Sequence, residues 1–142
     1  MSIHLVGTVG GQAIALPAES VEAVVSIGQV VPVPGAPPGI HGLAAIRSRM
    51  LTVIDTAWVV GAAAGQGSYM AIVSLNGHGY GLMLEAVEDV VELGETRPVP
   101  STLSPGWMRL NPQMCDHQGR VLLVVDAEML VAAASVTHAR AA

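Results

Sequence analysis

The sequence lacks features on which several function classes depend. Its 142 residues include no lysine, and six arginines stand against 11 acidic residues, giving a formal net charge of −5. A nucleic-acid-binding surface requires a basic stripe to neutralise phosphates, so we expect no nucleic-acid partner. The only cysteine, Cys115, cannot form an internal disulfide, which fits a reducing compartment.

Aromatic residues and long apolar runs are also scarce. Phenylalanine is absent, although 51% of the chain is hydrophobic, so the core must be largely aliphatic. No apolar stretch reaches the roughly 18 residues that a membrane-spanning helix needs. The N-terminus lacks the basic segment and apolar run of a secretory signal. We therefore expect a cytoplasmic location without direct membrane insertion, and apolar faces of the kind that bind other proteins.

Catalytic signatures are missing as well. The chain has no Gly-x-Ser-x-Gly elbow, no P-loop and no His-Glu-x-x-His motif. Cys115 and His117 stand two positions apart, but no second pair lies at ligand spacing, which argues against a zinc site. We predict no catalytic residue, no metal and no cofactor.

The chain does contain an internal repeat. Residues 11–34 align without a gap with residues 77–100, and residues 49–55 correspond to residues 120–126. A repeat of this length indicates two similar supersecondary units, each too small to bury its apolar face alone. We expect the units to pack on each other, with matched residues on equivalent strand faces.

Alternating apolar and polar residues predict a fold rich in β-strands. Strands are expected over residues 3–9, 21–27, 49–54, 69–75, 79–84, 87–93 and 121–125. Gly10-Gly11 and Asn76-Gly77 predict tight hairpin turns, because Gly and Asn accept a positive φ. Short strands with regular turn signals favour small barrels or a sandwich.

Helix is expected in two places, near residues 56–64 and from Asp126 to about residue 135, followed by a frayed tail over residues 136–142. Asp55 and Asp126 end the two copies of the duplicated strand. Because both copies keep the aspartate, we expect each one to cap the following helix by accepting its free backbone N–H groups.

Five acidic residues gather in the second copy of the repeat. They are Glu85, Glu88, Asp89, Glu92 and Glu95. Two interpretations remain open. The charges mark either a solvated sheet edge, where they discourage aggregation, or a surface that binds a basic partner.

The clearest basic spot is Arg47-Ser48-Arg49. Arg49 has a repeat counterpart in Arg120, which favours a structural role. Arg47 has no evident counterpart and is the better candidate for binding. The alternative is an ordinary surface arginine that contributes little to stability.

Residues 33–55, VPGAPPGIHGLAAIRSRMLTVID, resemble the CheW family of bacterial chemotaxis coupling proteins. In that family a proline-rich connection precedes an Ile-x-Gly segment, an Asn-Leu-Arg-Gly turn and a Pro-Val-Ile-Asp-Leu strand. Residues 81–90 and 119–126 extend the resemblance over nearly the whole chain.

The resemblance implies an all-β fold in which two small SH3-like barrels pack over a shared apolar core, with one or two short helices including a C-terminal one. Residues 1–142 would form one CheW-like domain. Within it, the repeats 11–55 and 77–126 would form barrel subdomains at about residues 16–68 and 69–126, with the N-terminal strand completing the second.

The resemblance also implies a non-catalytic signalling adaptor. Its expected partners are the cytoplasmic tip of a chemoreceptor (a methyl-accepting chemotaxis protein) and the regulatory domain of a CheA-type histidine kinase. Recruitment to membrane chemoreceptor arrays and self-association through CheW-like contacts are further expectations. Two alternatives remain: a CheW-like scaffold in another kinase pathway, such as surface motility or development, and a small β-barrel ligand-binding module or enzyme.

The resemblance carries over Arg47 as the motif arginine, with Gly42 and Asp55 as framework positions, and the expected sites extend to further residues. Partner binding is expected at the motif arginine and its neighbours: Arg47, Ile40, Ile46, Ser48 and Arg49. The expected framework residues are Gly28, Gly42, Asp55, Gly94 and Asp126.

Four positions depart from the family pattern. Ala45, Ile46 and Ser48 stand where the family has Asn, Leu and Gly. In a left-handed conformation Ser48 would cost roughly 1–2 kcal/mol. Ala23 stands where the family has the glutamate that pairs with the motif arginine. Glu22 is adjacent, but strand alternation would point its side chain to the other face.

Overall fold

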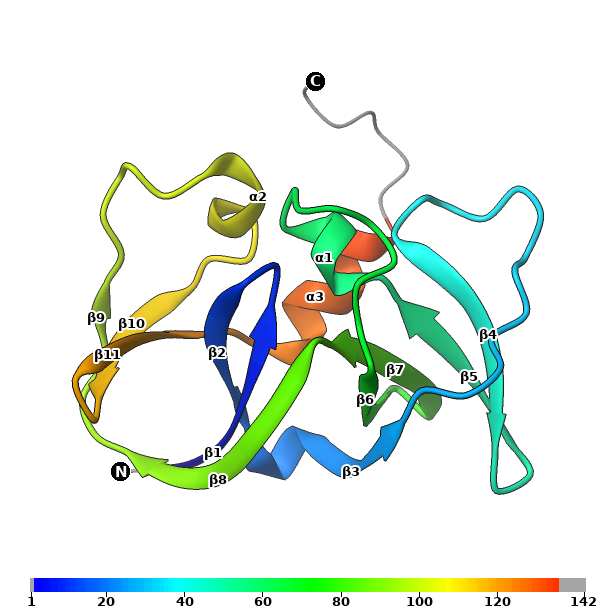
Figure 1. Cartoon of the computed structure of the whole chain (residues 1–142), viewed down its shortest axis with the longest axis horizontal. Helices are drawn as coiled ribbons and strands as arrows, with labels where there is room; N and C mark the ends of the chain where they lie inside the picture. Colours follow the sequence, from blue (N-terminus) through cyan, green and yellow to red (C-terminus); the bar gives the residue numbers. More distant parts are fainter. Residues whose placement is uncertain (1, 136–142) are drawn as a thin grey trace.

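The structure is a computed structural model that describes residues 2–135, so the predicted frayed tail lies outside the described residues. Its strands form two curved sheets lying side by side (Figure 1). We call the five-stranded sheet barrel 1 and the six-stranded sheet barrel 2.

Barrel 1 runs in the order β3 (Val21–Ser26), β6 (Tyr69–Leu75), β7 (His78–Leu84), β5 (Arg49–Ile54) and β4 (Ile40–Ile46). Barrel 2 runs in the order β8 (Ala86–Leu93), β1 (Ser2–Val9), β2 (Gln12–Pro17), β11 (Arg120–Val124), β10 (Gln113–His117) and β9 (Arg97–Pro98). The predicted fold class, two small β-barrels with few short helices, is confirmed.

The two barrels are built alike. The order β3-β6-β7-β5-β4 corresponds strand by strand to β8-β1-β2-β11-β10, and in each barrel one pair, β5–β7 or β11–β2, is parallel. Val53 pairs with Gly81, and its repeat counterpart Val124 pairs with Ala15. The repeat therefore preserves strand register as well as strand order, as the ungapped alignment predicts.

The two copies of the repeat exchange strands between the barrels. The strand correspondence extends the first copy back to β1 and the second back to β6. The first copy thus supplies β1 to β5, but its β1–β2 hairpin completes barrel 2. The second copy begins with the β6–β7 hairpin, which completes barrel 1. Residues 69–84, predicted to belong to the second barrel, therefore lie in the first. The reason is that β6 hydrogen-bonds to β3 and β7 to β5, so barrel 1 is unfinished without the hairpin of the second copy.

Three apolar clusters hold the structure together. The largest lies between the barrels and draws side chains from both, among them Leu82 and Leu123. A second cluster fills barrel 1 around Leu51, and a third fills barrel 2 around Leu122, the repeat counterpart of Leu51. The predicted shared core is thus present, and each barrel adds a small core of its own.

The helices lie against the shared core, with α1 (Thr56–Val59) and α3 (Ala127–Ala134) between the sheets (Figure 1). The short α2 (Pro105–Met108) and the 3₁₀ helix η1 (Ala18–Ser20) were not predicted from the sequence. α1 is shorter than the predicted helix over residues 56–64. Among residues 2–135, no helix is long and apolar enough to cross a membrane.

Both predicted caps are present. The Asp55 carboxylate accepts a hydrogen bond from the Trp58 backbone N–H at 3.1 Å and another from the Gly65 N–H at 2.8 Å. The Asp126 carboxylate accepts one from the Glu128 N–H at 2.9 Å. The bonds from Trp58 and Glu128 satisfy N–H groups that a helix start leaves without an intrahelical partner, and the bond from Gly65 ties the following loop to Asp55.

The expected framework glycines divide into two classes. A Cβ added at Gly42 would lie 2.3 Å from the Val31 carbonyl oxygen, because Val31 exchanges backbone hydrogen bonds with Leu43 alongside β4. At Gly28 and Gly94 an added Cβ would meet nothing within 4 Å. Packing therefore requires glycine at position 42 and does not require it at positions 28 and 94.

We predict that Gly42→Ala lowers the free energy of unfolding by about 1–3 kcal/mol, the usual cost of forcing extra volume into a packed site. Gly28→Ala is the matched control, since its new methyl group enters open space. It should leave stability unchanged or raise it by up to about 1 kcal/mol, through a less flexible unfolded chain. Urea unfolding of both variants makes the comparison, and equal losses would contradict the packing argument.

Candidate functional site

The candidate site lies at the tip of the β4–β5 hairpin. Ile46 pairs with Arg49, which leaves Arg47 and Ser48 as a two-residue turn, with φ values of 52° and 66°. A two-residue turn of this kind needs positive φ at both positions. The turn keeps the left-handed geometry despite the serine, so the two side chains are presented at some cost in backbone strain.

The other two-residue hairpins avoid this strain at their second position. They are Gly10-Gly11, Asn76-Gly77 and Gln118-Gly119, all with positive φ. Gln118 occupies the position in barrel 2 that Arg47 occupies in barrel 1. Arg47 therefore does have a counterpart position, which the sequence alignment did not identify, but the counterpart is uncharged.

Arg49 is engaged within the chain. Its Nη1 lies 2.6 Å from Glu22 Oε2, its Nη2 donates to the Ser74 hydroxyl, and that hydroxyl donates to Glu22 Oε1. The Ser74 hydrogen bond, together with the hydrogen bond and charge of Arg49, holds the pKa of the Glu22 carboxyl below its usual value. This network joins β3, β5 and β6 at the open end of barrel 1.

Sequence reasoning missed Glu22 because of a β-bulge. The β3–β6 register shifts between Val21 and Ala23, so Glu22 is the extra residue and simple alternation fails there. Glu22 and Ala23 consequently line the same cavity. The repeat carried a usable signal, since Glu22 and Arg49 recur as Glu88 and Arg120.

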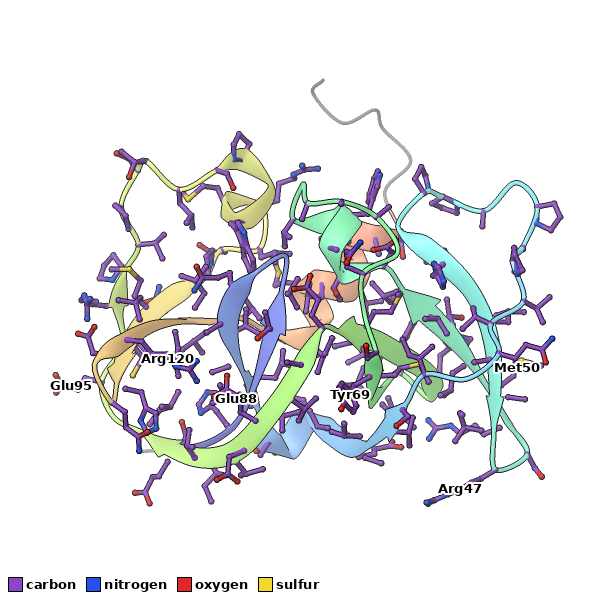
Figure 2. The ribbon with its side chains drawn as sticks, viewed as in Figure 1. Arg47, Met50, Tyr69, Glu88, Glu95 and Arg120 are labelled. Atoms are coloured by element: carbon purple, nitrogen blue, oxygen red, sulfur yellow. The ribbon has the colours of Figure 1, made fainter. Side chains whose placement is uncertain are left out.

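Barrel 2 repeats the ion pair. Arg120 Nη2 lies 2.5 Å from Glu88 Oε1, beside a bulge in the β1–β8 pairing. The recurrence indicates that the pair serves the barrel itself, which agrees with the structural role favoured for Arg49. Figure 2 shows Glu88 and Arg120 in the half of the molecule opposite to Arg47.

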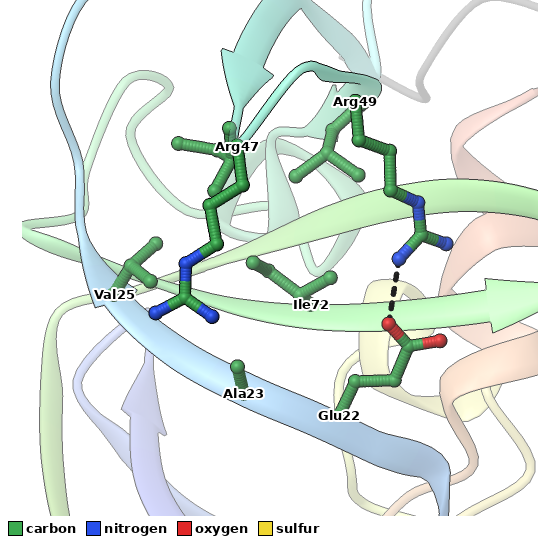
Figure 3. Close-up of a pocket in the computed structure, with 8 residues that line it drawn as sticks. Glu22, Ala23, Val25, Arg47, Arg49 and Ile72 are labelled. Carbon is green, nitrogen blue, oxygen red and sulfur yellow. Dashed lines mark hydrogen bonds and ion pairs between the residues drawn. The ribbon is translucent and has the colours of Figure 1, made fainter.

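Arg47 differs from Arg49 in having no internal partner. Its side chain is exposed, and within residues 2–135 it forms no side-chain hydrogen bond or ion pair. Figure 3 shows its guanidinium group over Ala23 and Val25, away from the Arg49–Glu22 pair. The cavity beneath it, which we call the Arg47 pocket, has a volume of about 210 Å³, and its apolar walls include Val25 and Ile72.

A second cavity lies next to the Arg47 pocket. Its volume is about 490 Å³, and apolar side chains such as Val30, Val31 and Met50 line it. Ile46 lines both cavities, so this predicted binding residue does lie beside Arg47. Ile40 does not: it lies at the far end of β4 and packs against the shared core.

The five acidic residues of the predicted cluster differ in their contacts. Glu85 accepts hydrogen bonds from the backbone N–H groups of Gly10 and Gly11, at 2.9 and 3.0 Å, and so holds the β1–β2 turn. Glu88 is in the ion pair with Arg120. Asp89 lies exposed on β8, and its carboxylate accepts a hydrogen bond from the adjacent Val90 N–H. In the described part of the chain, no three His, Cys, Asp or Glu side chains gather as metal ligands would.

Comparison with known proteins identifies relatives of this architecture. The sequence model of the CheW-like domain matches residues 4–135. No curated protein sequence matches the chain. The structure is similar to the crystal structure of the scaffolding protein TtCheW from Thermoanaerobacter tengcongensis, with a TM-score of 0.77 and 20% sequence identity, covering 89% of this chain and 84% of that one. At this identity the likeness demonstrates a shared fold.

The network around Glu22 gives a pH prediction. The carboxyl pKa of Glu22, followed by NMR titration, should lie below the usual value of about 4.3, and Ser74→Ala or Arg49→Ala should raise it towards that value. A pKa lowered by folding stabilises the protein above the unfolded-state value, and this contribution is lost as the pH falls through the folded-state value. As the pH falls below about 4, the Glu22→Gln variant should therefore lose less unfolding free energy than the wild-type protein. An unshifted pKa in the wild-type protein would contradict the network.

The strained turn gives a stability prediction. Ser48→Gly relieves roughly 1–2 kcal/mol of left-handed strain, less about 0.4–1 kcal/mol for the freer unfolded chain. The net rise in unfolding free energy should be about 0.8 kcal/mol, between limits of about 0 and 1.6 kcal/mol, measured by urea unfolding. Ser48→Ala keeps the strain and should give no increase. A gain with alanine as large as that with glycine would show that the turn is not the cause.

Proposed function

This chain belongs to the CheW-like domain family, and from that membership we propose that it is a non-catalytic signalling adaptor. It couples the cytoplasmic tip of a chemoreceptor to the regulatory domain of a CheA-type histidine kinase. It acts in the cytoplasm, and its partners recruit it to membrane receptor arrays, where CheW-like contacts between copies add to the assembly.

One observation carries the proposal: the two barrels expose matching apolar residues. Val24 and Met50 on barrel 1 are 37% and 59% exposed, and their repeat counterparts Val90 and Val121 on barrel 2 are 53% and 40% exposed. Contiguous exposed apolar side chains mark contact surfaces, and equivalent exposed residues on both barrels fit a fold that uses each barrel for one contact. Two such surfaces on one small protein suit an adaptor, which must hold two partners together.

The two surfaces differ in charge, which supports two different partners. Barrel 1 presents the unpaired Arg47, whereas barrel 2 presents Gln118 at the equivalent position and the exposed acids Asp89 and Glu92 on β8. Charge differences of this kind select partners and suppress wrong pairings more than they add affinity. One scaffold, used twice, can therefore recognise two proteins.

The alternative of a ligand-binding module or enzyme has less support. The residues that line the two cavities at the β4–β5 hairpin include no histidine and no cysteine, and Glu22 is their only acid. Glu22 is already held by Arg49 and Ser74. Catalysis at this site would require a nucleophile with a base, or two carboxyl groups in different environments. A role in another kinase pathway would use the same surfaces with other partners.

Capture of two partners tests the proposal. Receptor-tip fragment and kinase regulatory domain should each bind the purified protein, and a ternary complex should form. Met50→Gln and Val121→Gln are matched variants at counterpart exposed sites, where unfolding should shift by no more than about 0.5 kcal/mol. Each should weaken one partner by about tenfold, as interface truncations can, and leave the other within error. Binding to neither partner would overturn the adaptor function.

A further inference from the structure

The Arg47 pocket holds a charge that the chain does not balance. The three ion pairs in the described residues use Arg49, Arg97 and Arg120. Arg47 stands apart from them, although it lies in the same pocket as the Arg49–Glu22 pair (Figure 3). Glu22 is the one acid that lines the pocket, and its carboxylate already binds Arg49 and Ser74.

The equivalent place in barrel 2 carries the missing acid. Asp89 is the repeat counterpart of Ala23, one residue after the bulge in each edge strand, and Gln118 is the counterpart of Arg47. The fold therefore accepts a carboxylate beside the bulge. Barrel 1 has the Arg47 cation without an acid at the position of Asp89. The small methyl group of Ala23 leaves the space for a carboxylate side chain unfilled.

The size and lining of the pocket define what can enter it. Its volume of about 210 Å³ falls below the roughly 300–1,000 Å³ of small-molecule sites, so it suits a single side chain better than a cofactor. Val25 and Ile72 form an apolar wall, and Arg47 supplies a forked donor at the rim. A side chain that fits both has an aliphatic stem and a terminal carboxylate, because guanidinium groups bind carboxylates through two parallel hydrogen bonds.

We propose that the Arg47 pocket receives a glutamate side chain from the partner protein that docks on barrel 1. Its stem lies on the wall beside Ala23, and its carboxylate pairs with the Arg47 guanidinium group. The inference rests on the proposed adaptor function and specifies how barrel 1 recognises its partner. The partner supplies the carboxylate of an ion pair for which this chain supplies only the guanidinium group. Glutamate suits the pocket better than aspartate, because the longer stem covers the apolar wall.

Ala23→Glu tests the inference by supplying the acid from within. The introduced carboxylate should occupy the pocket and weaken capture of the barrel 1 partner by about tenfold, the scale of losing an interface ion pair. Ala23→Gln, of equal size and no charge, fills the pocket without pairing with Arg47 as an ion pair, so it should weaken capture less, and the difference between the two variants measures the contribution of the charge. Arg47→Ala should lose about as much as Ala23→Glu, and the double variant should lose no more than either, because both changes remove one interaction. Affinities for receptor-tip fragment and kinase regulatory domain are measured separately by calorimetry.

A second measurement needs no partner. The carboxyl introduced by Ala23→Glu should titrate below about 4.3 in NMR, and Arg47→Ala should return it to that value. An unshifted pKa would overturn the pocket geometry. If the wild-type protein binds a partner and Ala23→Glu binds it equally well, the inference fails while the adaptor function stands. If the wild-type protein binds neither, both fail. Loss of self-association on Arg47→Ala, seen by sedimentation, would assign the pocket to a second copy of the chain and overturn the proposal.

Discussion

The exchange of hairpins between the two repeat copies is the constraint on which the rest of the structure depends. Barrel 1 needs β6–β7 from the second copy, and barrel 2 needs β1–β2 from the first. Neither copy can finish its hydrogen-bonded sheet alone, and the largest apolar cluster lies between the two sheets. Losing either hairpin would leave unpaired strand edges and an exposed core face at once. The two barrels are therefore expected to unfold as one cooperative unit.

Comparison of the two barrels distinguishes residues that both barrels share from residues that differ between them. The glutamate–arginine pair at the bulge occurs in both barrels, as Glu22–Arg49 and Glu88–Arg120. Such exposed pairs contribute little to stability, so their value lies in fixing the edge strand beside the bulge. The neighbouring positions differ between the barrels, and the proposed adaptor function assigns to them the recognition of different partners.

Sequence patterns predicted the regular strands well and the irregular places poorly. Strands over residues 49–54 and 69–75 were predicted with their observed bounds, because each is a short run rich in apolar and β-branched residues. β4 was missed because glycine and alanine at its centre give little β signal. The β6–β7 hairpin was assigned to the wrong barrel, because a repeat shows which segments are alike and does not show which of them pair. The bulge at Glu22 could not be predicted from alternation, because a bulge is a failure of alternation.

The position of Arg47 follows from that same irregularity. The bulge brings Glu22 to Arg49, which takes the nearby acid away from Arg47. The two-residue turn fixes the backbone of Arg47 at a positive φ, and the guanidinium group lies over Ala23 (Figure 3). Strain of this kind persists where surrounding strands determine the turn geometry, and it is characteristic of binding sites. In the proposed partner binding, a turn whose backbone is already fixed lowers the entropy cost of ordering the hairpin around a partner carboxylate.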